Sequence, residues 1–387
     1  MEKICRRISE IGTVVGGGTP STKNPDYWGG DIPWISPKDL TDYKSVYISK
    51  GENFLTEKGL KSGTRLLPKN TLLFSSRAPI GYVALAANPI CTNQGFKSIV
   101  CDEKQVVPLY LYYYMKANLD YIKLFGTGAT FPEISGKTMG KIKVEIFKSL
   151  DVQHRIASIL STYDSLIENN AKRIRLLEKM AENLYKEWFV RFRFPGHENV
   201  EMENGLPKGW KRGSLSDVCE FKRGKNITSS EMQEGNVPVI SAGLEPSGYH
   251  SCSNVRGVNV TMSSSGANAG YIAIHYSDIW AADCSYIEES TTGNIYYVYE
   301  LLNNIRTVIN NFQRGAAQPH VYPKDVNRIK LILPSKELML KANGLLEIMH
   351  KEIYNLQKQN SLLARQRDLL LPRLMSGKLE VKEELLE

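Results

Sequence analysis

The chain has 387 residues, of which 42% are hydrophobic and 23% are charged. This composition excludes a disordered chain, and the length is sufficient for two or three domains. The formal net charge of +8 favours an anionic partner such as nucleic acid. A modest basic excess is also common in proteins that bind no nucleic acid, so the charge alone does not assign a partner.

The sequence has no pattern for metal binding, secretion or membrane insertion. Its six cysteines lie far apart without a Cys-x-x-Cys pair, and its six histidines are equally scattered, so we expect free thiols and no zinc site. The N-terminus lacks the apolar core of a signal peptide, and no apolar run approaches the roughly 18 residues of a membrane span. We therefore expect a soluble, cytoplasmic protein without a membrane partner.

The first 150 residues alternate short β-like segments, such as "YVALAA" and "KSIVC", with one helix-like stretch, "LYLYYYMKANLDYIKLF". This mixture predicts a compact α+β body. The tyrosines of the helix-like stretch could stack on bases, but their helical spacing favours the core face of a helix. They are Tyr110, Tyr112, Tyr113, Tyr114 and Tyr121.

The loop "GTGATFPEISGKT" (126–138) contains Gly-x-Gly and Gly-Lys-Thr, which are features of phosphate-binding loops. A Walker-type loop needs a glycine five residues before its Gly-Lys, and a dinucleotide fingerprint needs its third glycine at the same position. Phe131 stands there, so we interpret the stretch as an ordinary turn that leads into a short strand.

Two long helices are predicted, one after each body. In the first, apolar residues recur at alternating steps of four and three from Ile156 to Trp188, interrupted by Asn170; in the second they recur from Ala342 to Leu374, interrupted by Asn360 and Arg367. This spacing is typical of a coiled coil. The expected organisation is a body over 1–150, a helix over 151–194, a linker over 195–210, a body over 211–336, a helix over 337–376 and a tail over 377–387.

The two bodies are diverged copies of one unit. "IPWIS" (32–36) matches "VPVIS" (237–241), and "SSRAPIGYVAL" (75–85) matches "SSGANAGYIAI" (264–274). "FGTGATFPEISGKTMGKIKV" (125–144) matches "FQRGAAQPHVYPKDVNRIKL" (312–331). Because the matches keep their order along the chain, they indicate an internal duplication with paired helices.

An antiparallel helix pair has a predictable register. Aligning opposite ends of the two apolar stripes places Ile156 against Leu374 and Asn170 against Asn360. We therefore expect the two asparagine side chains to meet and hydrogen-bond each other, because a buried amide without a partner costs about 1–3 kcal/mol.

Polar and aromatic loops in both copies supply the candidate DNA-binding residues. Amides can pair with adenine edges, and arginine or lysine can pair with guanine or with phosphate. In the first copy the candidates are Lys23, Asn24, Tyr27, Lys38, Arg77, Asn93, Gln94 and Lys97. In the second copy they are Lys222, Arg223, Lys225, Asn226, Asn268, Arg314 and Gln318.

Catalytic motifs are weak in comparison. "NPDYW" (24–28) is similar to the Asn-Pro-Pro-Tyr loop of adenine methyltransferases, but Asp26 replaces the second proline and no Gly-rich cofactor-binding segment follows a strand. No Gly-x-Ser-x-Gly elbow is present. A non-enzymatic alternative to a DNA reader is a coiled-coil scaffold whose globular heads bind protein.

The whole pattern resembles the specificity subunit of type I restriction-modification systems. The resemblance is carried by "GGGTPSTKNPDYWGGDIPWISPKDL" (16–40), by "HRIASIL" (154–160) after the first copy, and by "LLARQRDLLLPRLMSGKLEV" (362–381). It implies an α+β protein with two tandem pseudo-symmetric target-recognition domains separated by two long antiparallel coiled-coil helices. The second copy departs from the pattern, because it opens with "CEFKRGKNITS" instead of a Gly-Gly-Thr-Pro run.

The resemblance also implies a function. Each repeat of this non-catalytic subunit would read one half of a bipartite double-stranded DNA site, and the helices would set the spacing between the halves. Two methyltransferase (modification) subunits would dock on the helices, and restriction subunits would join them. No cofactor would bind this chain, since S-adenosylmethionine and ATP would belong to the partners.

Overall fold

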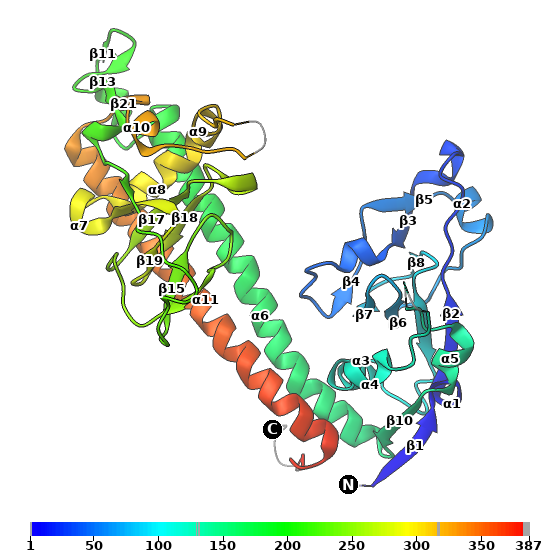
Figure 1. Cartoon of the computed structure of the whole chain (residues 1–387). Helices are drawn as coiled ribbons and strands as arrows, with labels where there is room; N and C mark the ends of the chain where they lie inside the picture. The colour runs from blue at the N-terminus through cyan, green and yellow to red at the C-terminus, as the bar shows by residue number, and fades with distance from the viewer. Residues whose placement is uncertain (1, 129, 131, 316–317, 382–387) are drawn as a thin grey trace. The chain divides into compact units, whose positions relative to one another are not determined.

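The computed structural model describes residues 2–128, 130, 132–315 and 318–381. Phe131, whose identity excludes a phosphate loop, lies outside these ranges. The chain forms two compact units, residues 1–171 with 359–387, and residues 172–358. Each unit contains one globular body together with part of both long helices, α6 (Leu150–Tyr185) and α11 (Lys336–Ser376) (Figure 1).

The body of the first unit is built on small sheets. The main sheet has the order β2 (Gly12–Gly16), β9 (Lys97–Cys101), β6 (Leu72–Ser76), β7 (Ile80–Ala86), β4 (Tyr47–Ile48). A second sheet has the order β5 (Asn53–Leu55), β3 (Trp28–Ile35), β8 (Cys91–Thr92), and β1 (Lys3–Arg7) pairs with β10 (Lys143–Phe147). Its helices are α1 (Ile8–Ile11), α2 (Glu57–Lys61), α3 (Pro108–Ala117), α4 (Leu119–Lys123) and α5 (Gly136–Lys141).

The body of the second unit repeats this topology, except that its main sheet has four strands and no counterpart of β4 among the described residues. Its main sheet has the order β14 (Lys222–Arg223), β20 (Cys284–Glu288), β17 (Asn259–Ser263), β18 (Ile272–His275). Its second sheet has the order β16 (Gly248–His250), β15 (Val237–Ile240), β19 (Trp280–Ala281), and β13 (Lys211–Ser214) pairs with β21 (Lys330–Leu333). The hairpin of β11 (Met202–Glu203) and β12 (Leu206–Pro207) precedes them, and the helices are α7 (Glu289–Thr292), α8 (Ile295–Asn304), α9 (Arg306–Asn310) and α10 (Pro323–Val326).

The equivalence extends to strand direction. β3 pairs with β8 in parallel, and β15 pairs with β19 in parallel, whereas the neighbouring pairs β6–β9 and β17–β20 are antiparallel in both bodies. Parallel pairs are less common than antiparallel pairs, and one at the same place in two sheets is not expected of unrelated domains. The internal duplication predicted from the sequence is therefore present in the fold.

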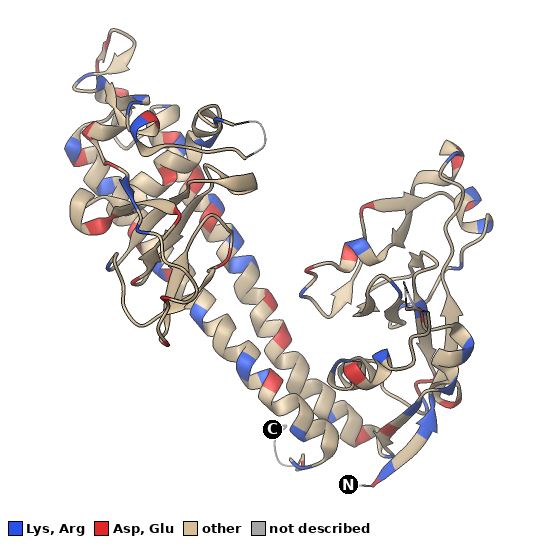
Figure 2. Cartoon of the chain, viewed as in Figure 1, with Lys and Arg blue, Asp and Glu red and all other residues tan. Residues whose placement is uncertain are grey.

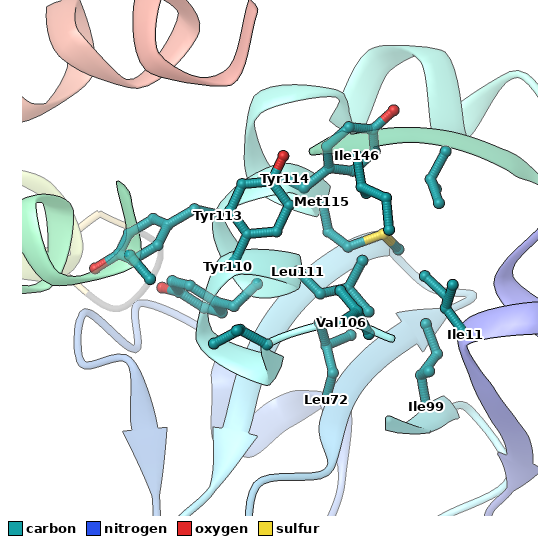
Figure 3. Packing of buried hydrophobic residues seen from close by; sticks show 14 of the residues in the cluster. Ile11, Leu72, Ile99, Val106, Tyr110, Leu111, Tyr113, Tyr114, Met115 and Ile146 are labelled. Carbon is teal, nitrogen blue, oxygen red and sulfur yellow. The ribbon is translucent and has the colours of Figure 1, made fainter. Parts of the chain in front are cut away.

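Both long helices contribute to the core of each body. In the first unit, Tyr110 of α3 and Leu72 of β6 lie in one buried cluster (Figure 3). Ile156 of α6 and Leu374 of α11 belong to the same cluster. In the second unit, Tyr297 of α8 is buried with residues from the end of α6, from the π-helical turn Lys186–Val190 and from the start of α11. The four tyrosines of α3 are thus core residues, as their spacing predicts, whereas Tyr121, which lies in α4, is exposed.

Buried amides of the long helices cap the main helix of each body. The side chain of Gln153 accepts a hydrogen bond from the Val107 amide at the start of α3 (2.8 Å). The side chain of Asn343 accepts bonds from the Tyr296 and Tyr297 amides at the start of α8 (3.1 Å each). The first amides of a helix have no partner within it, so these two side chains both satisfy the helix end and attach the body to the long helix.

The long helices run antiparallel within each unit. In the first unit, a guanidinium nitrogen of Arg367 in α11 pairs with the carboxylate of Asp164 in α6, which also accepts a hydrogen bond from the Tyr113 hydroxyl (2.5 Å). In the second unit, Arg173 in α6 pairs with Glu352 in α11 (2.6 Å). Figure 2 shows residues of both charges interspersed along these helices.

The two seam asparagines take different partners from the mutual pair that the sequence predicted. The Asn170 amide donates to Oε1 of Gln359, the neighbour of Asn360 in the chain (3.3 Å), and the Asn360 amide donates to the main-chain oxygen of Ile167 (3.3 Å). A carbonyl oxygen has two lone pairs, so the Ile167 carbonyl in α6 can accept the bond from Asn360 in addition to a main-chain bond of its own helix. Both residues lie in one stretch of the seam, but their side chains are not bonded to each other among the described hydrogen bonds.

The cap at α8 predicts the effect of Asn343→Ala. The substitution leaves two buried amides without an acceptor, so we expect the free energy of unfolding of the second unit to fall by about 1–3 kcal/mol. Chemical unfolding measures this change, with Lys341→Ala as the control at an exposed position two residues earlier in α11. Equal stability of the two variants would contradict the capping role.

Candidate nucleic-acid interface

The first body gathers its candidate residues where β6 ends and β9 begins. These strands are antiparallel neighbours, so Arg77, directly after β6, and Lys97, the first residue of β9, come to the same edge of the sheet. Nζ of Lys97 lies 3.1 Å from one carboxylate oxygen of Glu133, and a guanidinium nitrogen of Arg77 lies 3.4 Å from the other. We call Arg77, Gln94, Lys97 and Glu133 loop site 1.

Gln94 and Asn93 have different roles in this region. Gln94 is exposed, its side-chain oxygen accepts a hydrogen bond from the Thr19 hydroxyl, and its main-chain oxygen accepts one from Nζ of Lys97 (3.2 Å). The side-chain oxygen of Asn93 instead accepts a bond from the Gly95 amide (2.8 Å), which fixes the turn. Gln94 is therefore exposed to a ligand even though its side-chain oxygen is bonded to Thr19, whereas the side-chain oxygen of Asn93 holds the turn.

The glycine run of the first copy permits a close approach of two loops. A Cβ atom at Gly17 would lie 2.0 Å from the main-chain oxygen of Asn93, so only glycine fits there. The second copy lacks the run, but Gly224 has the same role, because its Cβ atom would lie 2.5 Å from the main-chain oxygen of Ala282. The different opening of the second copy thus keeps the one glycine that the loop contact requires.

The other candidates of the first body lie in a separate region. Asn24 caps the short 3-10 helix Pro25–Tyr27 by accepting from the Asp26 amide (3.1 Å). Lys38 pairs with Glu52 at 3.0 Å, and this hydrogen-bonded carboxylate raises the lysine pKa. Among the described contacts, no hydrogen bond or ion pair links these residues, Lys23 or Tyr27 to loop site 1.

The second body forms an equivalent group at the edge where β17 ends and β20 begins. Arg223 of β14 pairs with Asp283 at 2.6 Å, and Asp283 also accepts a hydrogen bond from the Ser265 hydroxyl. Ser265 and Arg314 each form a bridge with the main chain of His320. We call Arg223, Ser265, Asp283, Arg314 and His320 loop site 2.

The remaining candidates of the second body surround loop site 2. Lys222 precedes Arg223 in β14, and Gln318 is exposed on the same hairpin as Arg314. Lys225 is exposed and its main-chain oxygen accepts a bond from Nε1 of Trp280 (2.9 Å). Asn226 is exposed beside it, and Asn268 ends the 3-10 helix Gly266–Asn268.

The sequence pattern singled out cations and amides but not their acidic neighbours in the two loop sites, Glu133 and Asp283. Five of the selected cations form an ion pair with a carboxylate, and DNA phosphate has to compete with that carboxylate. They are Lys97 and Arg77 with Glu133, Lys38 with Glu52, Arg223 with Asp283, and Arg314 with Asp325 (2.9 Å).

The cysteines near these sites are not reactive. Burial raises the pKa of Cys91 to about 11 and that of Cys284 to about 12, so both side chains are neutral thiols at physiological pH. Within the described ranges, no group of three or more His, Cys, Asp or Glu side chains could hold a metal ion. No helix of the described part is long and apolar enough to cross a membrane.

The duplicated α+β bodies, each with a polar loop site at the same edge of its sheet, define a two-site recognition protein. A family model described as the type I restriction modification DNA specificity domain matches residues 3–179 and 207–359. The chain belongs to this family: it is a DNA specificity subunit of a type I restriction-modification system and a non-catalytic component of that complex. The match decides in favour of a DNA reader over a protein-binding scaffold.

Individual relatives agree with this assignment. The chain is 36% identical to the type I restriction enzyme MjaIX specificity subunit of Methanocaldococcus jannaschii, over 98% of this chain and 94% of the relative. It is 31% identical to the EcoR124I/EcoR124II specificity subunit of Escherichia coli over 50% of this chain and 49% of that one. The crystal structure of a type I specificity subunit from Mycoplasma genitalium has the same fold, with a TM-score of 0.69, 21% identity, and coverage of 97% of this chain and 96% of that chain.

The exposed Lys225 allows a test of the second site. We expect Lys225→Ala to weaken binding on all DNA sequences alike and to lower the slope of log affinity against log salt by about one, because a phosphate contact releases a counterion. Titrations at several salt concentrations measure the slope. The control is Lys208→Ala, which removes an exposed lysine paired with Glu201 (2.8 Å) outside the site; equal slopes for the two variants would remove Lys225 from the interface.

Proposed function

We propose that each body reads one half of a bipartite, asymmetric double-stranded DNA site. The observation that carries this proposal is one topology with two different site chemistries. Loop site 1 offers Arg77 and Lys97 around Glu133, whereas loop site 2 offers Arg223 with Asp283 and an imidazole at His320. Two readers with the same frame but different hydrogen-bonding groups suit two different half-sites.

The helix pair is proposed to set the spacing between the two half-sites. A pair with a specified register holds two attached bodies at one separation, whereas a slipping pair would not. The partly buried polar bonds of Asn170 and Asn360 and the ion pair of Asp164 favour one register, because each group would lose its partner after a shift.

The partners are proposed to be two methyltransferase subunits and, joined to them, restriction subunits, in a cytoplasmic complex. S-adenosylmethionine and ATP would bind those partners. Exposed apolar residues along the long helices support a docking surface, because single soluble chains rarely expose such residues in groups. They are Leu166, Leu176 and Met180 in α6 and Leu340, Leu345, Ile348, Leu362 and Leu369 in α11.

Exchange of one body tests the two-reader proposal. When residues 1–150 are replaced by the corresponding body of another family member, we expect one half of the methylated site to change and the other half to stay the same. Methylation profiling of DNA from cells that carry the complete system measures both halves at once.

The reciprocal exchange of residues 211–336 is the matched control, and it should change only the other half. A simultaneous change of both halves after a single exchange would contradict independent reading by the two bodies.

A further inference from the structure

The hairpins that follow α4 and α9 hold one residue of each body in the same place. Glu133 exchanges two main-chain hydrogen bonds with Thr127 (3.1 and 2.9 Å), and His320 exchanges two with Arg314 (2.9 and 2.8 Å). The next amide in each hairpin donates to a main-chain oxygen at the end of the central strand. Ile134 bonds to Ser76, the last residue of β6 (3.0 Å), and Val321 bonds to Ser264, directly after β17 (3.0 Å). Glu133 and His320 are therefore structural equivalents.

The neighbouring residue fixes the position of each side chain. Ile134 and Val321 are fully buried in the cores of their bodies. Successive side chains of extended backbone point to opposite sides, so the side chain before each of them is directed away from the core. A side chain on such an anchored backbone has the fixed geometry that reading a base edge requires.

The surroundings of Glu133 suit a base edge rather than a phosphate. Its side chain is 36% exposed, and the carboxylate lies between Lys97 and Arg77, whose side chains are 16% and 38% exposed. A carboxylate only accepts hydrogen bonds and repels phosphate, so Glu133 weakens the binding of the DNA phosphate backbone by the two cations. A partly exposed ion pair contributes only about 0–1 kcal/mol, so stability does not explain its presence there.

Base edges do offer donors to a carboxylate. In the major groove, cytosine presents its N4 amino group and adenine its N6 amino group, while guanine presents acceptors to arginine or lysine. A carboxylate between two cations therefore matches a step that carries an amino group beside a guanine. His320 offers a ring nitrogen at the equivalent position, and its ring stacks on Tyr322 with an interplanar angle of 19°.

We infer that Glu133 is a base-reading residue of the first body and accepts a hydrogen bond from the amino group of a cytosine or an adenine in its half-site. His320 is the corresponding base-reading residue of the second body. This inference rests on the proposed function and adds to it the position in each hairpin that determines one base of the sequence.

The test uses Glu133→Gln in the complete system. The variant keeps the size of the side chain but replaces one acceptor by a donor. We expect the preference for one base pair in the half-site of the first body to fall by about tenfold, because one such contact supplies discrimination of that order. Binding to a series of duplexes with each half-site position changed in turn, together with methylation profiling, identifies whether that position is a cytosine or an adenine.

The matched control is Glu145→Gln, which removes another carboxylate of the first body that pairs with a lysine, Lys3, at 3.4 Å. It should leave the methylated sequence unchanged. His320→Gln should alter one position in the other half only.

Two results would overturn the inference. If Glu133→Gln changed affinity equally on all sequences, the carboxylate would merely screen Arg77 and Lys97. If it left the sequence preference intact, it would not contact a base. Either result leaves the two-reader proposal standing, because that proposal fails only when exchange of a whole body alters both halves or neither.

Discussion

The attachment of each body to the long helix that follows it is the constraint on which the rest of the structure depends. It is made by a buried side-chain amide, Gln153 in α6 and Asn343 in α11, that caps the main helix of the body. An uncapped helix end in these cores would leave buried amides without partners. The caps therefore fix the orientation of α3 and α8, and with them the sheets whose edges carry the two loop sites.

A second polar contact reinforces each attachment with different chemistry. In the first unit the hydroxyl of Tyr113 in α3 bonds to Asp164, which also pairs with Arg367. In the second unit Glu300 of α8 bonds to a ring nitrogen of His350 in α11 (3.2 Å), and the hydroxyl of Tyr276 lies 2.9 Å from the other. Glu300 and His350 are both buried, so loss of His350 would leave the Glu300 carboxylate without this partner inside the core. Each body is thus held on the helices by at least two buried polar contacts, while its loops remain free to differ.

The sequence was sufficient for the features that repeat and for those with a period. The ordered matches between the copies predicted one topology used twice, and the spacing from Ile156 to Trp188 predicted the first long helix. Arg77, Gln94 and Lys97 could be selected because their residue types suit DNA, and the structure brings them together. Glu133 could not, because its place beside Lys97 depends on a hairpin contact across 36 residues of chain. The partners of Asn170 and Asn360 were also beyond the pattern, since a heptad gives the facing residues but does not distinguish Gln359 from Asn360 as the bonded neighbour.

The central claim is that one frame, used twice, presents two chemically different sites to the two halves of one DNA sequence. A structure of the complete complex on its methylated target tests it most directly, by the distances from base edges to the loop sites. The account predicts Arg77, Lys97 and Glu133 in the major groove of one half, and Arg223, Arg314 and His320 in the major groove of the other. Contact of the DNA with other faces of the two bodies, or with one loop site alone, would contradict it.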